Sequence, residues 1–243
     1  MSAFTRIPPM AFDGPPILIK PAACTAPDRG LIDWTPSLAA RSWLKRAIDR
    51  SLSAIALIAL LPILLVVAAL VRAESPGPIL FRQRRMGLGG RPFTCLKFRT
   101  MVPDAEARLA DLESHNESAG GVLFKLKRDP RITPLGRILR KTSLDELPQL
   151  WNVFRGEMSL VGPRPLQIRD SERLAKLDSE GYMHRLSVLP GITGPWQVGG
   201  RSETDSETML RLDLNYVDRW SIGADLGILW KTVGVVVLGK GAC

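Results

Sequence analysis

The sequence has few of the residues that build disulfide frameworks and transition-metal sites. Its 243 residues include three cysteines, Cys24, Cys95 and Cys243, which are odd in number and far apart. This spacing fits neither a disulfide framework nor a zinc site, and it indicates a reducing compartment for the folded part. Because the chain has two histidines, a His-rich metal site is not expected. Any bound metal would be Mg²⁺ on carboxylates and phosphates.

Acidic residues are also in the minority. Asp and Glu number 24 against 33 Lys and Arg, which gives a formal net charge of +9. Such a surplus favours polyanionic partners, which include nucleic acid, anionic lipid headgroups and nucleotide phosphates. The length allows one sizeable core or two small domains. Since no aromatic and basic strand motif for base stacking is present, nucleic acid is the least favoured of these partners.

One long stretch has no charge at all. Residues 51–71 read "SLSAIALIALLPILLVVAALV", and a straight helix of this length would be roughly 31 Å long, the thickness of a bilayer's hydrocarbon core. A buried core helix of this length would normally keep a polar edge. A secretory signal is not indicated, because the run starts late and no small-residue cleavage site follows it. The run therefore predicts a membrane segment.

Pro62 lies almost at the centre of this run, where it removes a backbone hydrogen bond and pushes Leu61 away from helical dihedrals. Two topologies follow: a kinked helix that spans the bilayer, or a hairpin that re-enters the side it came from. Basic residues flank both ends: Lys45, Arg46 and Arg50 before the run, and Arg72, Arg82, Arg84 and Arg85 after it. A hairpin keeps both clusters in the cytosol, but proline is tolerated in spanning helices, so the residues alone leave both topologies open.

The remaining pattern divides the chain into three parts. Residues 1–41 are rich in proline and predict an irregular arm, residues 42–72 hold the membrane segment, and residues 73–243 form the remaining domain. The stretch "GPILFRQRRMGLGGRPFTCLKFRTM" predicts two short strands joined by a turn at 87–90. That turn lacks the Lys-Ser/Thr ending of a phosphate loop.

Five further helices are expected. A polar helix is predicted at 103–114, two helices at 133–141 and 143–156, and two amphipathic helices between 203 and 238. The apolar side of the last helix could pack on the core or lie at a membrane interface, and both alternatives stay open. The chain has no internal repeat.

The stretch "SLDELPQLWNVFRGEMSLVGPRP" places Asp145 and Glu146 side by side among arginines. One interpretation is a capping box, with Ser143 as the N-cap and Glu146 as its partner. Asp145 would then lie in the first helical turn, where the helix terminus keeps a carboxylate ionised and would stabilise an attached phosphate. A carboxylate can also act as a nucleophile toward phosphorus, and the nearby arginines suit phosphoryl transfer. The two interpretations are compatible.

Two Pro- and Gly-rich segments add candidate binding residues. "GPRP" presents Arg164 from a turn that two prolines make rigid. "PGITGPWQVGGRS" is predicted to be irregular, with Gln197 and Arg201 near its end; it could cradle a nucleotide, although a Gly-rich loop alone does not establish this.

Taken together, "KRAIDR", "SPGPILFRQRRMG", "FTCLKFRTM", "TPLGRILRKTSLDELPQLWNVFRGEMSLVGPRP" and "LPGITGPWQVGGRS" resemble the bacterial sugar transferases, small monotopic polyprenyl-phosphate phosphoglycosyl transferases. The resemblance covers residues from about 42 to the C-terminus. It implies transfer of a sugar-1-phosphate from a UDP-sugar to undecaprenyl phosphate with release of UMP, in the initiation of exopolysaccharide or glycoconjugate assembly.

The resemblance also implies roles for individual residues. Asp145 would be the nucleophile that forms an aspartyl-phosphosugar, and Glu146 would be tied to Mg²⁺. The expected substrate-binding residues are Lys97, Arg99, Arg140, Arg164, Gln197 and Arg201.

For the fold, the resemblance implies a helix that re-enters the cytosolic leaflet of the inner membrane. The expected fold class is α+β, mostly α: a re-entrant membrane helix hairpin broken at Pro62, then a small cytosolic catalytic domain with a short β-hairpin and amphipathic interfacial helices. Related sequences often have Ser before the central proline, whereas this chain has Leu61, so the break rests on Pro62 alone.

The alternative function is a membrane-anchored basic protein that binds nucleic acid or serves as a scaffold without catalysis. It would explain the charge and the anchor, but not the paired carboxylates or the Pro-Arg-Pro turn. A nucleic-acid partner is therefore not expected. The transferred sugar and the formation of a homo-oligomer stay open.

Overall fold

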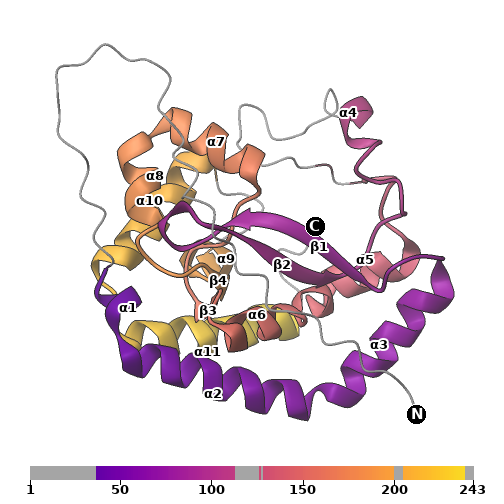
Figure 1. Ribbon diagram of the computed structural model, residues 1–243, viewed down its shortest axis with the longest axis horizontal. Helices are drawn as coiled ribbons and strands as arrows, with labels where there is room; N and C mark the ends of the chain where they lie inside the picture. Colours follow the sequence, from indigo (N-terminus) through magenta and orange to yellow (C-terminus); the bar gives the residue numbers. More distant parts are fainter. Residues whose placement is uncertain (1–36, 113–125, 127, 200–204, 239–243) are drawn as a thin grey trace, which may run out of the picture.

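The computed structural model describes residues 37–112, 126, 128–199 and 205–238. The described part is mostly helical with small two-stranded sheets, which confirms the α+β, mostly α class (Figure 1). The elements up to the acidic pair are α1 (Leu38–Arg41), α2 (Trp43–Ala59), α3 (Leu61–Glu74), β1 (Leu80–Met86), η1 (Leu88–Gly90), β2 (Pro92–Phe98), α4 (Leu109–Leu112), α5 (Pro134–Lys141) and η3 (Leu144–Glu146). Those after it are α6 (Gln149–Arg155), β3 (Ser159–Val161), α7 (Ile168–Leu177), α8 (Ser179–Arg185), β4 (Gly191–Thr193), α9 (Pro195–Gly199), α10 (Ser206–Asp218) and α11 (Ile222–Leu238).

The apolar run forms two helices, α2 and α3, with a bend of 64° between them. Pro62 stands in the first turn of α3, where its missing N–H costs no helical bond, and Leu60 is the non-helical residue at the break. Leu61 is helical, so the expectation that it would leave the helical region is wrong. No single helix in the described ranges is long and apolar enough to cross a membrane, whereas the bent pair meets that criterion by length and composition.

The predicted β-hairpin is confirmed. Strands β1 and β2 pair antiparallel, with Gln83 opposite Cys95 and Phe81 opposite Lys97. The turn contains Gly89 at φ 62°, a left-handed conformation that glycine adopts without steric cost. A second pair, β3 and β4, is parallel. Strand β4 and the helix α9 that follows it lie within residues 190–202, which were predicted to be irregular. That prediction was wrong for residues 191–199, and residues 1–36 of the predicted arm lie outside the described ranges.

Some of the predicted helices are confirmed, and others are shorter than predicted. Helices α5, α10 and α11 appear where the pattern placed them. The polar helix expected from 103 is limited, within the described residues, to α4, because residues 103–108 form turns. The helix expected from 143 begins at Gln149, after a short 3₁₀ turn.

Two of the four buried apolar clusters among the described residues connect the elements around the hairpin. One joins the end of the hairpin to α7, α8, α9 and α10 through Met86, Leu166, Leu174, Tyr182, Leu186, Trp196, Met209 and Leu210. The other joins α3 to β2 and α5 through Val67, Val71, Phe98 and Leu139. The C-terminal half of the bent pair is therefore packed on the strand and helix that lead to the acidic pair.

A buried polar cluster fixes the other end of the bent pair. Lys45 on α2 donates to Asp225 of α11 at 2.6 Å, and Tyr216 and Trp220 donate to the same carboxylate at 2.8 and 3.1 Å. Lys45, which the sequence placed in the basic cluster before the apolar run, is therefore paired inside the protein.

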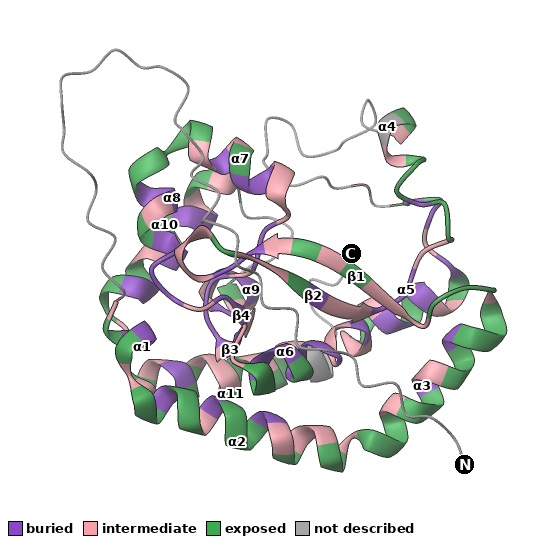
Figure 2. Cartoon of the chain, in the orientation of Figure 1, coloured by how far each residue is buried: buried purple, intermediate pink, exposed green. Residues whose placement is uncertain are grey.

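Large apolar side chains are exposed along α2, α3 and α11, the lower edge of the molecule in Figure 1 (Figure 2). They are Trp43, Leu44, Leu52, Ile55, Ile58, Leu61, Ile63, Leu65, Val66, Leu70, Leu226, Trp230 and Val233. Helix α11 has one side on the core and one side exposed: Ile228 and Leu229 pack on the core, while Trp230 is 80% exposed. Such an apolar surface is far larger than single scattered exposed residues and marks an interaction site.

Candidate active site

Asp145 and Glu146 lie in the 3₁₀ turn η3 between α5 and α6. Ser143 precedes them with a φ of 56°, and its side chain forms no capping hydrogen bond, so the capping-box interpretation is wrong. The physical reason is Pro148, which cannot sit in a helix interior and instead occupies the N-cap of α6. A left-handed serine costs about 1 kcal/mol and occurs in this protein directly beside the acidic pair.

Glu146 is held by two cations. Its Oε1 accepts from Lys97 Nζ at 2.6 Å and from Arg164 Nη2 at 2.7 Å, while Oε2 accepts from Arg164 Nη1 at 3.4 Å. Burial alone would raise the pKa of Glu146, but Arg164 and Lys97 outweigh it and lower this pKa far below its ordinary value. Glu146 is therefore a fixed anion that orders Lys97 and Arg164 around the turn.

Asp145 is 7% exposed and has a different electrostatic environment. Burial raises its pKa, and the neighbouring charge of Glu146 adds to the rise, while Lys97, Arg140 and Arg164 oppose it. The sequence led us to expect a helix terminus that keeps this carboxylate ionised. The rise shows that desolvation outweighs the cations, because Glu146 already takes the closest contacts with two of them. A raised pKa makes the carboxylate more basic and more nucleophilic once ionised.

Arg140 comes to the site from the last turn of α5. Thr133 caps that helix through a 3.0 Å bond from Gly136 N, and Pro134 starts it, as the sequence pattern predicts. Gly136 lets the helix approach the segment after β2, because a Cβ there would be 2.1 Å from the Thr100 carbonyl oxygen. Across this contact Arg140 Nε donates to Thr100 Oγ1 at 2.9 Å.

Arg85 belongs to the site, although the sequence suggested only a flanking role for it. Arg85 lies on β1, two residues after Gln83 and on the same face of the hairpin. Its charge interacts with those of Arg164 and Glu146. Burial lowers its pKa. The signal that could have found it is the two-residue alternation of the hairpin, which in this register puts Arg85 on the same face as Lys97.

The remaining predicted site residues have other partners or lie outside the described ranges. Arg99 donates to the carbonyls of Val71, Ser75 and Pro76, at the C-terminal end of α3. Gln197 is buried in α9 and donates to the Ile192 carbonyl at 2.8 Å. These contacts give both residues a supporting role in the fold. Arg201 lies outside the described residues.

A metal ion would have few protein ligands here. Within the described ranges no group of three or more His, Cys, Asp or Glu side chains could hold one. Mg²⁺, however, is commonly bound by one or two carboxylates together with substrate phosphates and water. Glu146 Oε2, whose contact with Arg164 Nη1 is long at 3.4 Å, is an oxygen that could accept such an ion. The donor set therefore fits a Mg²⁺ ion that is completed by substrate.

Comparison with known proteins shows what this arrangement belongs to. The family model described as "Bacterial sugar transferase" matches residues 40–239. The chain belongs to the bacterial sugar transferase family. The match covers the bent helix pair, the hairpin and the Asp145–Glu146 turn.

Several curated relatives agree with this assignment. The exopolysaccharide production protein ExoY of Sinorhizobium fredii is 43% identical over 82% of this chain and 87% of its own length. The undecaprenyl-phosphate galactose phosphotransferase of Salmonella typhimurium is 43% identical over 85% of the chain and 43% of its own length. The UDP-glucose:undecaprenyl-phosphate glucose-1-phosphate transferase of Escherichia coli is 41% identical over 82% and 41%. The sugar transferase thus spans less than half of these last two relatives.

Proposed function

We propose that this sugar transferase transfers a sugar-1-phosphate from a UDP-sugar to undecaprenyl phosphate, as the first step in assembly of an exopolysaccharide or related glycoconjugate. Family membership and the names of the relatives support the reaction class. One observation carries the proposal. Asp145 is buried with a raised pKa, and the adjacent Glu146 binds Lys97 and Arg164 next to it.

The reaction proceeds in two displacements at phosphorus. An Asp145 oxygen attacks the β-phosphorus of the donor, the bond from that phosphorus to the bridging oxygen breaks, and UMP leaves. The resulting aspartyl-phosphosugar is then attacked by an oxygen of the lipid phosphate, which breaks the bond to Asp145 and restores its carboxylate. Lys97, Arg140 and Arg164 offset the charge on the phosphate oxygens, which is the main requirement of phosphoryl transfer.

The direct test uses purified protein, undecaprenyl phosphate, Mg²⁺ and a panel of UDP-sugars, with UMP release as the readout. We expect release with at least one donor and dependence on the lipid phosphate for multiple turnovers. Salt-dependent binding to random DNA without any UMP release would instead favour the non-catalytic alternative.

Mg²⁺ is the proposed cofactor, bound by Glu146 and the donor phosphates, where it would neutralise charge on the diphosphate. Activity should disappear in EDTA and return when Mg²⁺ is added in excess. A titration of UMP release against free Mg²⁺ measures this. Full activity in the chelator would contradict the metal requirement.

For the membrane we propose that α2 and α3 re-enter the cytosolic leaflet of the inner membrane. The 64° bend and the exposed apolar side chains along both helices support this topology. The exposed face of α11, with Trp230, would lie at the same interface. Residues 73–243 would then form the cytosolic catalytic domain.

Cysteine labelling tests the topology. In a background with the native cysteines replaced by serine, Arg41→Cys and Ala73→Cys introduce exposed thiols just before and at the end of the helix pair. A membrane-impermeant thiol reagent added to intact cells should label neither, and it should label both after permeabilisation. Labelling of just one thiol in intact cells would establish a spanning pair instead.

A further inference from the structure

The turn that presents Arg164 is held by its backbone carbonyls. Pro163 and Pro165 have no backbone N–H, so this turn cannot form a regular series of backbone hydrogen bonds within itself. Four consecutive carbonyls nevertheless have partners: Pro163 O accepts from Gly191 N at 2.9 Å, Arg164 O from Arg185 Nη2 at 2.6 Å, Pro165 O from Arg85 Nη1 at 2.6 Å, and Leu166 O from Met86 N at 3.0 Å. The contact on the residue that binds Glu146 comes from Arg185.

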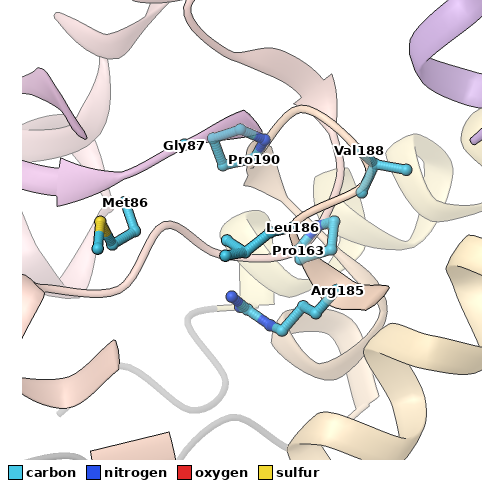
Figure 3. Close-up of a pocket in the computed structure, with 7 residues that line it drawn as sticks. All are labelled: Met86, Gly87, Pro163, Arg185, Leu186, Val188 and Pro190. Atoms are coloured by element: carbon cyan, nitrogen blue, oxygen red, sulfur yellow. The ribbon is translucent and has the colours of Figure 1, made fainter. Parts of the chain in front are cut away.

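Arg185 reaches this carbonyl from the last turn of α8, beneath the turn that contains Pro163 (Figure 3). Its guanidinium is oriented by Asp213 of α10, which accepts from Nε at 2.8 Å. Asp213 is fully buried, and Arg185 is 4% exposed. A buried ion pair of this kind costs desolvation free energy and is weak evidence for stability on its own. Its geometry, however, leaves Nη2 directed at the Arg164 carbonyl.

We propose that Arg185, oriented by Asp213, is a positioning residue for the phosphoglycosyl transfer. By fixing the Arg164 backbone, it sets the guanidinium of Arg164 against Glu146 and next to Asp145. Arg185 itself donates to a backbone carbonyl and to Asp213, so it acts through Arg164. This inference rests on the proposed function.

The planar guanidinium is what makes this arrangement work. Nε bonds the Asp213 carboxylate while Nη2 bonds the Arg164 carbonyl, so both contacts are held in one rigid plane. A lysine at this position keeps the charge but offers a single flexible nitrogen. Arg185→Lys should therefore preserve the buried pair and loosen the turn.

A double-mutant cycle tests the inference with purified full-length enzyme and the active UDP-sugar. Arg185→Lys should lower kcat/KM by about tenfold to a hundredfold, the range expected for a small misplacement of a catalytic group. In an Arg164→Lys background, where the positioned guanidinium is already gone, the same change should cost less than about twofold. Asp213→Asn keeps the shape of the side chain, and its effect on kcat/KM is measured in the same two backgrounds. The test therefore does not depend on the folding of a single variant.

Arg131→Lys is the matched control, because Arg131 is also buried and pairs with an aspartate, Asp129, at 2.6 Å, and the backbone carbonyl to which it donates is that of Ala105. Its effect should be the same factor in both backgrounds. Equal losses from Arg185→Lys or Asp213→Asn in both backgrounds, or no loss at all, would overturn the positioning role. Absence of turnover in the wild type with every donor would instead defeat the proposed function itself.

Discussion

Asp145→Asn should lower turnover by about a thousandfold or more, the scale of loss seen when a covalent nucleophile is removed. Asn keeps the shape of the side chain but has no negative oxygen to attack phosphorus. The measurement is UMP release under single- and multiple-turnover conditions. Asp178→Asn is a suitable control: Asp178 caps α8 at Gly181, and Asn caps a helix as well as Asp does, so its turnover should stay near wild type. Turnover of Asp145→Asn near the wild-type rate would remove Asp145 from the mechanism.

The same substitution should leave the fold as stable as the wild type or more stable. The folded-state pKa of Asp145 is raised, so the folded protein holds this proton more tightly than the unfolded chain does. Stability is therefore lost as the pH rises from the ordinary Asp value of 3.8 through this higher folded-state pKa, and a neutral Asn avoids this cost. An unchanged or higher thermal midpoint at pH 7, together with lost turnover, separates a chemical role from a structural one.

Glu146→Gln should have the opposite effect on stability. It leaves Lys97 and Arg164 partly buried without their shared counterion, which costs about 3 kcal/mol or roughly 6–12 °C in Tm. Since the folded-state pKa of Glu146 is lowered, its stabilising effect is present at neutral pH. This stabilisation is lost as the pH falls below the ordinary Glu value of 4.5 toward the folded-state pKa. The difference in Tm between Glu146→Gln and the wild type should therefore shrink over that pH range.

Asp104→Asn is the matched control for that experiment. Asp104 pairs with Arg108 on the surface, where the two side chains are 52% and 54% exposed, so the change should shift stability by no more than about 0.5 kcal/mol. Thermal unfolding of the three proteins in one detergent or lipid preparation gives the comparison. Equal midpoints for Glu146→Gln and the wild type would show that Glu146 does not organise the cations of the site.

Local patterns were enough to predict several elements. Two strand-like stretches around a Gly-rich turn identified the β1–β2 hairpin, and the pattern of residues 133–141 identified α5. The acidic pair, Lys97, Arg140 and Arg164 were also named from the sequence, and the structure brings their charges together. In each case the deciding signal lies within a few residues of the feature.

Features that depend on contacts between distant segments were missed. Ser143 matched a capping box by spacing, but Pro148 delays the helix and leaves the serine left-handed. Arg99 stays a predicted substrate-binding residue, but local patterns did not indicate that it also donates to carbonyls that precede it by 23 to 28 positions. The raised pKa of Asp145 depends on burial, which single-sequence patterns do not report.

The central claim is that Asp145 carries the sugar-phosphate between donor and acceptor. The measurement that tests it most directly is incubation of the enzyme with Mg²⁺ and a donor labelled in its β-phosphate, without undecaprenyl phosphate, followed by mass spectrometry of the peptide that contains Asp145. We predict stoichiometric UMP release, label on that peptide, loss of the label when the lipid phosphate is added, and no label on Asp145→Asn. A wild-type enzyme that turns over with acceptor but never acquires label, or an Asp145→Asn protein that does acquire it, would contradict the account.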